Sequence, residues 1–195
     1  MCIRDRPLSV PNEVLLAYLA RQWSNIGGKV LLSGEAADEF FAGYDRVFRW
    51  AADAEIFTIN EFLKLYSYVN IDRIPSEILQ KVERYFIGLS HMPVFEQVRY
   101  FFIDKHLPIL FRRLDFSLMF SGVEGREPLA TIELLRFALQ CTPSELLNQR
   151  VGKLPLRNLL KTNMGHSFAY NAKVGFPVDV GEIFERKSTK TNRQE

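Results

Sequence analysis

The sequence places three carboxylates close together after a short apolar run. Glu35, Asp38 and Glu39 lie within five residues of one another and follow the run at residues 29–32. Carboxylate oxygens can hold a hard cation such as Mg²⁺ beside waters and phosphate oxygens, or take a proton from a reacting group. Acidic residues are also common at helix starts, where they match the helix dipole. The residue types therefore leave two interpretations open, a ligand site and a simple helix start.

The elements around these carboxylates predict where they would be held. The run at residues 29–32 is bounded by glycines and small residues, which is typical of a buried strand. Ser33 and Gly34 would turn the chain, and residues 37–41, acidic and then apolar, would begin a helix. Because a helix over residues 13–20 precedes the strand, the order helix, strand, turn, helix predicts an α/β fold. Ligands in such folds bind at the carboxyl ends of the strands, and Gly34 would let one approach the backbone closely.

The rest of the chain is patterned mainly as amphipathic helices. These are predicted over residues 60–69, 76–87, 94–105, 114–119, 132–139 and 156–161. Pro75, Pro93 and Pro108 stand at the expected boundaries. The aromatic-rich run at residues 95–102 could belong to the core or to an interface, and its helical spacing favours the core. One strand is too little sheet for a complete α/β domain, so we expect further strands upstream of residue 7.

Composition narrows the class of protein. The formal net charge is +2, from 25 Lys and Arg against 23 Asp and Glu, which leaves no basic surplus for a nucleic-acid partner. No apolar stretch is long enough to span a membrane, and residues 1–6 lack the apolar core of a secretory signal. The two cysteines, Cys2 and Cys141, exclude a disulfide framework and a four-thiolate zinc site. We therefore expect a cytoplasmic protein that binds neither nucleic acid nor membranes.

Residues 33–44 carry the most informative motif. They read Ser-Gly-Glu-Ala-Ala-Asp-Glu-Phe-Phe-Ala-Gly-Tyr. This resembles the Ser-Gly-Glu-Gly-x-Asp-Glu-x-Phe-Gly-Gly-Tyr motif of the asparagine synthetase family and of relatives such as β-lactam synthetase. Ala36 and Ala42 stand where the family has glycine. A glycine that needs a positive φ resists replacement by alanine, so these two positions test the geometry of the loop.

A second resemblance lies at residues 113–117 and 122–129. They are similar to the family's Arg-x-Asp-x-x-Ser and Glu-x-Arg-x-Pro-Phe-Leu-Asp runs. Thr131 replaces the final aspartate, so the contact that this aspartate makes in relatives is not carried over. We expect Glu124 and Arg126 to form a structural ion pair rather than to act in catalysis, because a buried pair of this kind usually specifies geometry.

A third resemblance lies at residues 152–157 and 171–177. They are similar to the family's Lys-x-x-Leu-Arg helix start and its Arg-x-Lys-x-Gly-Phe loop, with Asn171 where arginine is common. Lys173 keeps the lysine that the family uses against the phosphates of ATP. A lone lysine is ordinarily a solvated surface group, and only its place in this motif favours the functional interpretation. The three motifs occur in the family's order.

The resemblance implies a fold and a domain organisation. The fold would be α/β, the mostly helical C-terminal part of an adenine-nucleotide α-hydrolase-like (ATP pyrophosphatase) parallel-sheet domain, truncated at its N-terminus. We expect a non-native lead at residues 1–6, a partial synthetase domain at residues 7–184 and a disordered tail at residues 185–195. The sequence contains no Ser-Gly-Gly-x-Asp-Ser loop, and no glutaminase sequence follows Cys2. The chain alone is therefore expected to be inactive.

The resemblance also implies roles for individual residues. The family activates a substrate carboxylate with ATP, releases pyrophosphate and captures the acyl-adenylate with ammonia. Glu35 would bind ammonia or take its proton, Asp38 would hold Mg²⁺, and Lys173 would place positive charge on the departing pyrophosphate. Ser33 and Gly34 would line the nucleotide side of the turn. The residues expected to support the site are Glu39, Tyr44, Arg46, Arg113, Glu124 and Arg126.

The implied function is that of a glutamine-dependent asparagine synthetase. It would adenylate aspartate and form the amide with ammonia from an N-terminal glutaminase, using ATP and Mg²⁺ and releasing AMP and pyrophosphate. A homodimer is left open. One alternative is a β-lactam-synthetase-like or other amide-forming ligase of the same fold. Another is an inactive remnant that binds a partner.

Overall fold

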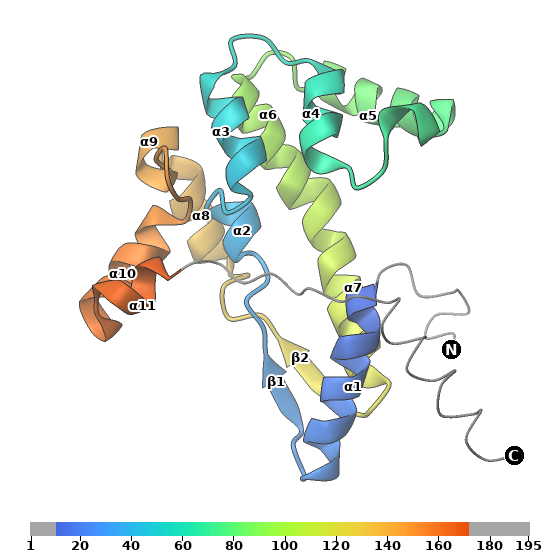
Figure 1. The fold of residues 1–195 in the computed structure, drawn as a ribbon, viewed down its shortest axis with the longest axis vertical. Coiled ribbons are helices and arrows are strands. Elements are labelled where there is room, and N and C mark those ends of the chain that lie inside the picture. The colour runs from blue at the N-terminus through green and yellow to red at the C-terminus, as the bar shows by residue number, and fades with distance from the viewer. Residues whose placement is uncertain (1–10, 172–195) are drawn as a thin grey trace, which may run out of the picture. The chain divides into compact units, whose positions relative to one another are not determined.

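A computed structural model describes residues 11–171 of the chain, and most of these residues are helical (Figure 1). The elements are α1 (Pro11–Asn25), β1 (Val30–Leu32), α2 (Ala37–Phe40), α3 (Asp45–Asp53), α4 (Ile59–Tyr66), the 3₁₀ turn η1 (Ile71–Arg73), α5 (Ser76–Gly88), α6 (Val94–Phe101), the π-helical turn η2 (Phe102–His106), α7 (Leu107–Met119), β2 (Glu124–Arg126), α8 (Ile132–Gln140), α9 (Pro143–Leu146), α10 (Leu154–Met164) and α11 (His166–Tyr170). The expectation of a mostly helical α/β protein is confirmed.

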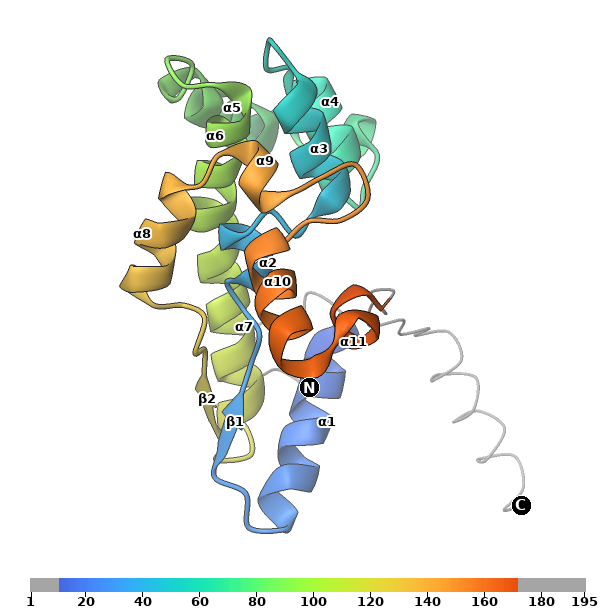
Figure 2. The same cartoon turned by 90° about the vertical axis from the view of Figure 1, so that its left-hand side faces the viewer.

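The chain divides into two units, which are described separately. The described part of unit 1 contains α1, β1, the end of α7 from residue 112, and β2. Its two strands pair in parallel, with Val30 opposite Glu124 (Figure 2). A small core holds the unit together, formed by Ala20, Leu114, Leu118 and Val123.

The two strands differ in how well the sequence predicts them. The strand expected at residues 29–32 is present as β1, but the expected burial is wrong, because none of its three residues is buried and Leu32 is 67% exposed. β2 could not be predicted from sequence, because Glu-Gly-Arg has no apolar residue and includes a glycine, which strands disfavour. β2 forms because pairing with β1 satisfies backbone donors and acceptors, and the extra bond from the backbone N–H of Glu124 to the carbonyl of Lys29 (2.8 Å) extends the ladder.

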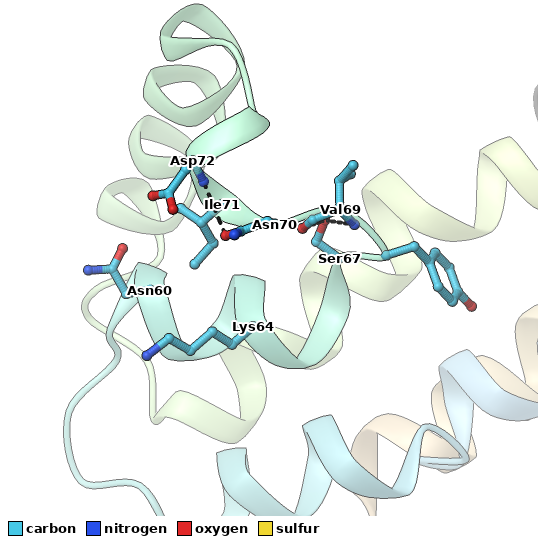
Figure 3. Close-up of a pocket in the computed structure, with 8 residues that line it drawn as sticks. Asn60, Lys64, Ser67, Val69, Asn70, Ile71 and Asp72 are labelled. Carbon is cyan, nitrogen blue, oxygen red and sulfur yellow. Dashed lines mark hydrogen bonds between the residues drawn. The ribbon is translucent and has the colours of Figure 1, made fainter.

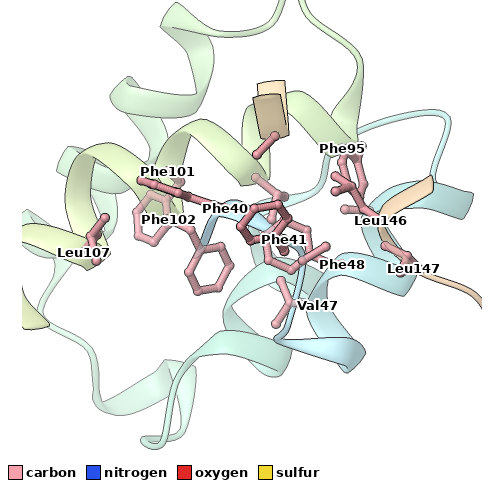
Figure 4. Close-up of a cluster of buried hydrophobic side chains, with 14 of the residues drawn as sticks. Phe40, Phe41, Val47, Phe48, Phe95, Phe101, Phe102, Leu107, Leu146 and Leu147 are labelled. Carbon is pink, nitrogen blue, oxygen red and sulfur yellow. The ribbon is translucent and has the colours of Figure 1, made fainter. Parts of the chain in front are cut away.

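Unit 2 covers residues 33–111 and 127–170 and has a core rich in aromatic rings. Figure 4 shows rings from α2, α3 and the α6–η2 segment gathered in this core. Phe48 and Phe62 are completely buried, and Phe102 packs at 5.1 Å from Phe48, measured between ring centroids. Burial of each such ring contributes about 1.5–3 kcal/mol. The aromatic run at residues 95–102 therefore belongs to the core, as its spacing predicts.

Pro108 does not end a helix, which corrects the boundary expected there. Pro75 and Pro93 do stand immediately before helices, as predicted. Pro108, in contrast, is the second residue of α7, which continues from α6 through the π-helical turn η2. A proline lacks a backbone N–H and clashes with the carbonyl four residues earlier, and the wider π turn accommodates both defects without breaking the helix.

Arg99 anchors α6 to the end of α8. Its side chain is 2% exposed and donates to both carboxylate oxygens of Glu96 and, at 2.7 Å, to the carbonyl oxygen of Ala138. It also reaches the carbonyls of Leu139 and Cys141. These carbonyls lie at the C-terminus of α8, where the helix itself supplies no donors.

We expect Arg99→Leu to lower the free energy of unfolding by about 3 kcal/mol, because buried carbonyls and Glu96 lose their donor. Denaturant unfolding measures this loss. The matched control is Arg84→Leu on the exposed face of α5, which should change stability by less than about 0.5 kcal/mol. Equal losses in the two variants would contradict the anchoring role.

No helix within residues 11–171 combines the length and the apolar character that crossing a membrane requires.

Candidate functional site

The three carboxylates lie on one short turn, residues 33–44, which we call the acid turn. Ser33 begins it, and its Oγ accepts a hydrogen bond from the backbone N–H of Glu35 (3.4 Å). Gly34 is exposed, and a Cβ added there would meet no atom within 4 Å, so the space beside this backbone is open. Glu35 is half-buried and Asp38 is 23% exposed at its side chain. The turn thus presents two accessible carboxylates beside open backbone.

Both alanines that replace family glycines have left-handed backbone conformations. Ala36 has φ 74° and Ala42 has φ 55°. These positions therefore do require the conformation that glycine adopts most easily, and alanine retains it at a steric cost of about 1–2 kcal/mol. Both methyl groups are completely buried, which offsets part of this cost. The acid turn therefore has left-handed conformations at both positions with alanine in place of glycine.

We expect Ala42→Gly to change the free energy of unfolding by less than about 0.5 kcal/mol, because relief of the left-handed strain offsets the lost methyl group and the more flexible unfolded chain. The matched control is Ala51→Gly, at an equally buried alanine inside α3. That variant should lose about 1.5–2 kcal/mol, since it gains no relief of strain. Thermal or urea unfolding of both variants compares them, and equal losses would argue against strain at Ala42.

Gly43 gives Asp38 the room it occupies. A Cβ at Gly43 would lie 1.9 Å from Oδ1 and 2.8 Å from Cα of Asp38, so both the carboxylate and the backbone of Asp38 would have to shift. The backbone N–H of Gly43 also donates to the carbonyl of Asp38 (2.8 Å). The end of the acid turn therefore folds back on the carboxylate that the motif assigns to the metal.

Lys153 completes the site, although its sequence pattern predicts no role for it. Its Nζ lies 3.0 Å from Oδ1 of Asp38, with 21% of its side chain exposed. It has φ 58° and precedes α10. The third motif contains this lysine, but sequence alone gave no reason to bring it to Asp38. The pair places one positive charge among the carboxylates of the acid turn.

The residues beside Lys153 dock directly on the acid turn. The backbone N–H of Lys153 donates to the carbonyl of Phe41 (2.9 Å), and that of Gly152 donates to Oδ1 of Asp45 (2.9 Å). A Cβ at Gly152 would lie 2.1 Å from the carbonyl oxygen of Ala42. Only glycine fits at this contact, so the first and third motifs form one structural unit.

Glu39 faces the interior and is more deeply buried than the other two carboxylates. It is 1% exposed, and its Oε1 accepts a hydrogen bond from the hydroxyl of Tyr44 (2.5 Å). Burial raises the pKa of Glu39, the charges of Asp38 and Glu35 raise it further, and the bond from Tyr44 acts in the opposite direction. Burial likewise raises the pKa of Tyr44, so this hydroxyl stays protonated and can donate.

The remaining residues expected at the site lie outside the acid turn. Arg46 is exposed in the first turn of α3. Arg113 is half-buried in α7 and belongs to unit 1, as do Glu124 and Arg126. The structure places Glu124 and Arg126 in an ion pair (3.0 Å), but their side chains are more than half exposed, which corrects the expectation of a buried pair. Lys173 lies outside the described residues.

Among the residues of the acid turn, Asp38 could serve as an oxygen ligand of Mg²⁺. Asp38 is a hard oxygen donor that already attracts a cation, the ammonium of Lys153, and Glu35 and Glu39 add negative charge nearby. No group of three or more His, Cys, Asp or Glu in residues 11–171 forms a complete metal site. Mg²⁺ does not need one, because one or two carboxylates suffice when phosphates and waters supply the other oxygens.

One pocket of unit 2 lies apart from the acid turn. It has a volume of about 530 Å³ and lies beside α4 and the loop that follows it (Figure 3). Its lining residues are Asn60, Lys64, Ser67, Tyr68, Val69, Asn70, Ile71 and Asp72. No residue of the acid turn is among them, so this pocket is not part of the candidate site.

Comparison with protein families gives one result that covers the whole chain. The family model described as asparagine synthase matches residues 1–195. No curated protein and no solved structure matched the chain.

Proposed function

Because the chain belongs to the asparagine synthase family, we propose that it carries the acidic half of the ATP-dependent site of an amide-forming ligase. The observation that supports this most strongly is the acid turn, where Glu35 and Asp38 are accessible beside the open backbone of Gly34. The ion pair of Lys153 with Asp38 supports it too, because it places a cation at this carboxylate. The proposed acyl substrate is aspartate, and the proposed source of ammonia is glutamine.

The proposed reaction has two steps. In the first, a carboxylate oxygen of the substrate attacks the α-phosphorus of ATP, and the bond to pyrophosphate breaks. Asp38 would hold Mg²⁺ through its carboxylate, and the metal would neutralise charge that develops on pyrophosphate. Lys153 lies at the same carboxylate and would add positive charge there, as Lys173 would from its motif.

In the second step, ammonia attacks the acyl carbon and AMP leaves. The nitrogen must lose a proton as the amide forms, and Glu35 would accept it. Glu35 suits this task because it is half-buried at the edge of the turn, with its backbone fixed by Ser33. Glu39 would not compete for this role, since it is buried and bonded to Tyr44.

The test is isotope exchange between pyrophosphate and ATP. It uses an enzyme in which this chain is joined to a Ser-Gly-Gly-x-Asp-Ser loop. We expect exchange that requires both Mg²⁺ and aspartate and that proceeds without ammonia, because adenylation precedes amide formation. Glutamate serves as the matched substrate control and should support little exchange. Absence of exchange with every carboxylate tried, from an enzyme that binds ATP, would refute the proposal.

A further inference from the structure

A chain of hydrogen bonds runs from the interior of unit 2 to the acid turn. The hydroxyl of Tyr66 on α4 lies 2.9 Å from Nδ1 of His106, and Nε2 of His106 lies 3.2 Å from the hydroxyl of Tyr44. Tyr44 in turn donates to Oε1 of Glu39, the residue next to Asp38. Three elements far apart in sequence therefore meet behind the proposed metal ligand.

With Tyr44 donating to Oε1 of Glu39, its oxygen is left to accept a bond, and Nε2 of His106 lies within reach to donate it in the Nε2–H tautomer. In that tautomer Nδ1 accepts from Tyr66. Oε1 of Glu39 can accept this bond whether or not the carboxyl group carries a proton on its other oxygen. The arrangement thus makes His106 the group that orients the hydroxyl of Tyr44.

The packing around His106 fixes its ring. His106 is the last residue of the π-helical turn η2, and such turns displace the side chains that follow them around the helix. Its ring meets the rings of Tyr44, Tyr66 and Phe102 edge-on at centroid distances of 5.2–5.5 Å. Tyr44 also stacks on Phe102 at 4.6 Å. Neither ring can turn without disturbing its neighbours.

The acid turn depends on such an external anchor because α2 supports itself poorly. α2 has four residues and begins after the left-handed Ala36, and the left-handed Ala42 follows it closely. Two i to i+4 bonds hold it, from Phe40 N–H to Ala36 (2.9 Å) and from Phe41 N–H to Ala37 (3.3 Å). Helices this short are unstable by themselves. The buried side chain of Glu39 therefore adds a polar constraint to the buried rings of Phe40 and Phe41.

We infer that His106 is a positioning residue, which acts through Tyr44 and Glu39 to hold Asp38 in the geometry that binds a divalent cation. This inference rests on the proposed function, in which Asp38 is the metal ligand. Groups that orient a ligand from behind commonly change metal affinity by about 10- to 100-fold when removed. His106 would act in this way without touching the metal.

The experiment measures binding of Mn²⁺ to the 195-residue chain by electron paramagnetic resonance of free Mn²⁺. We expect His106→Leu and Tyr44→Phe each to weaken binding by about tenfold. His106→Gln keeps an N–H donor near Nε2 and should retain most of the affinity. The decisive variant is the double substitution. If His106 acts through Tyr44, His106→Leu in the Tyr44→Phe background should weaken binding no further.

Two controls separate the possible failures. His91→Leu removes an exposed histidine and should leave Mn²⁺ affinity unchanged. Asp38→Asn tests the metal ligand itself. If Asp38→Asn leaves binding unchanged, the metal assignment in the proposed function fails. If Asp38→Asn removes binding while Tyr44→Phe and His106→Leu do not weaken it, the assignment stands and the positioning role is refuted.

A purely structural role would also give a distinct result. It would make the two substitutions additive in Mn²⁺ affinity, or make His106→Gln as damaging as His106→Leu, and either outcome overturns the inference. Should His106→Leu fail to fold, Tyr44→Phe and His106→Gln still decide the question. Tyr44→Phe preserves the stacked ring and removes only the hydroxyl, so an unchanged Mn²⁺ affinity in that variant overturns the inference as well.

Discussion

We expect Asp38→Asn to abolish pyrophosphate release in an enzyme assembled from this chain and a Ser-Gly-Gly-x-Asp-Ser loop. The substitution keeps the size of the side chain and removes the negative charge that would hold Mg²⁺ against the phosphates. Stability should fall by no more than about 1 kcal/mol, because the pair with Lys153 is partly exposed and such pairs contribute little. Release of pyrophosphate is followed with a coupled assay, and stability by thermal unfolding.

The matched control for this substitution is Asp53→Asn at the exposed end of α3, which should release pyrophosphate at the normal rate. Lys153 provides a second check. Asp38→Asn leaves the ammonium of Lys153 without its carboxylate, and high salt would screen that charge. High salt cannot replace the lost metal ligand, so it should not restore pyrophosphate release. An Asp38→Asn enzyme that releases pyrophosphate normally would rule out Asp38 as the metal ligand.

Glu35→Gln separates the two steps of the proposed reaction. Glutamine keeps the size and the hydrogen-bonding capacity of Glu35 but cannot accept a proton. We expect amide formation to fall by about 10²- to 10⁴-fold, the range typical of a lost general base, while exchange between pyrophosphate and ATP continues. Amide product is measured by chromatography and exchange with labelled pyrophosphate in the same preparation.

The control for Glu35 is Glu55→Gln, an exposed carboxylate beyond the end of α3. It should change neither activity. If Glu35→Gln reduced exchange and amide formation together, Glu35 would belong to the metal and nucleotide site instead. If it changed neither, the carboxylate would serve only the entry to α2.

The sequence predicts the parts of the fold that carry a strong local pattern. The apolar run that becomes β1, the helices after Pro75 and Pro93, and the buried aromatic run all follow from such patterns. β2 has no such pattern, because it is a strand only through pairing with β1. The helix boundary expected at Pro108 is wrong for a related reason. A π-helical turn has no sequence signal strong enough to outweigh the proline that follows it.

The site residues, too, include some that the sequence predicts and some that it does not. Glu35, Asp38 and Glu39 could be identified because they are neighbours in sequence. His106 and Tyr44 are separated by 62 residues, and the contact of Lys153 with Asp38 also joins distant segments. A lone histidine or lysine gives no local sign of such a partner. Long-range contacts of this kind follow from the packing of unit 2, which the sequence does not reveal.

The docking of Gly152 on the acid turn has a consequence for inheritance and design. A Cβ at Gly152 would collide with the carbonyl of Ala42, and one at Gly43 with Asp38, so both glycines pack closely against the acid turn. A change at Gly152 can be tolerated only together with a compensating shift in the acid turn, so substitutions there should be strongly epistatic. A transplant of the acid turn into another scaffold would therefore have to bring Gly152 and Lys153 with it, although the two segments are remote in the gene.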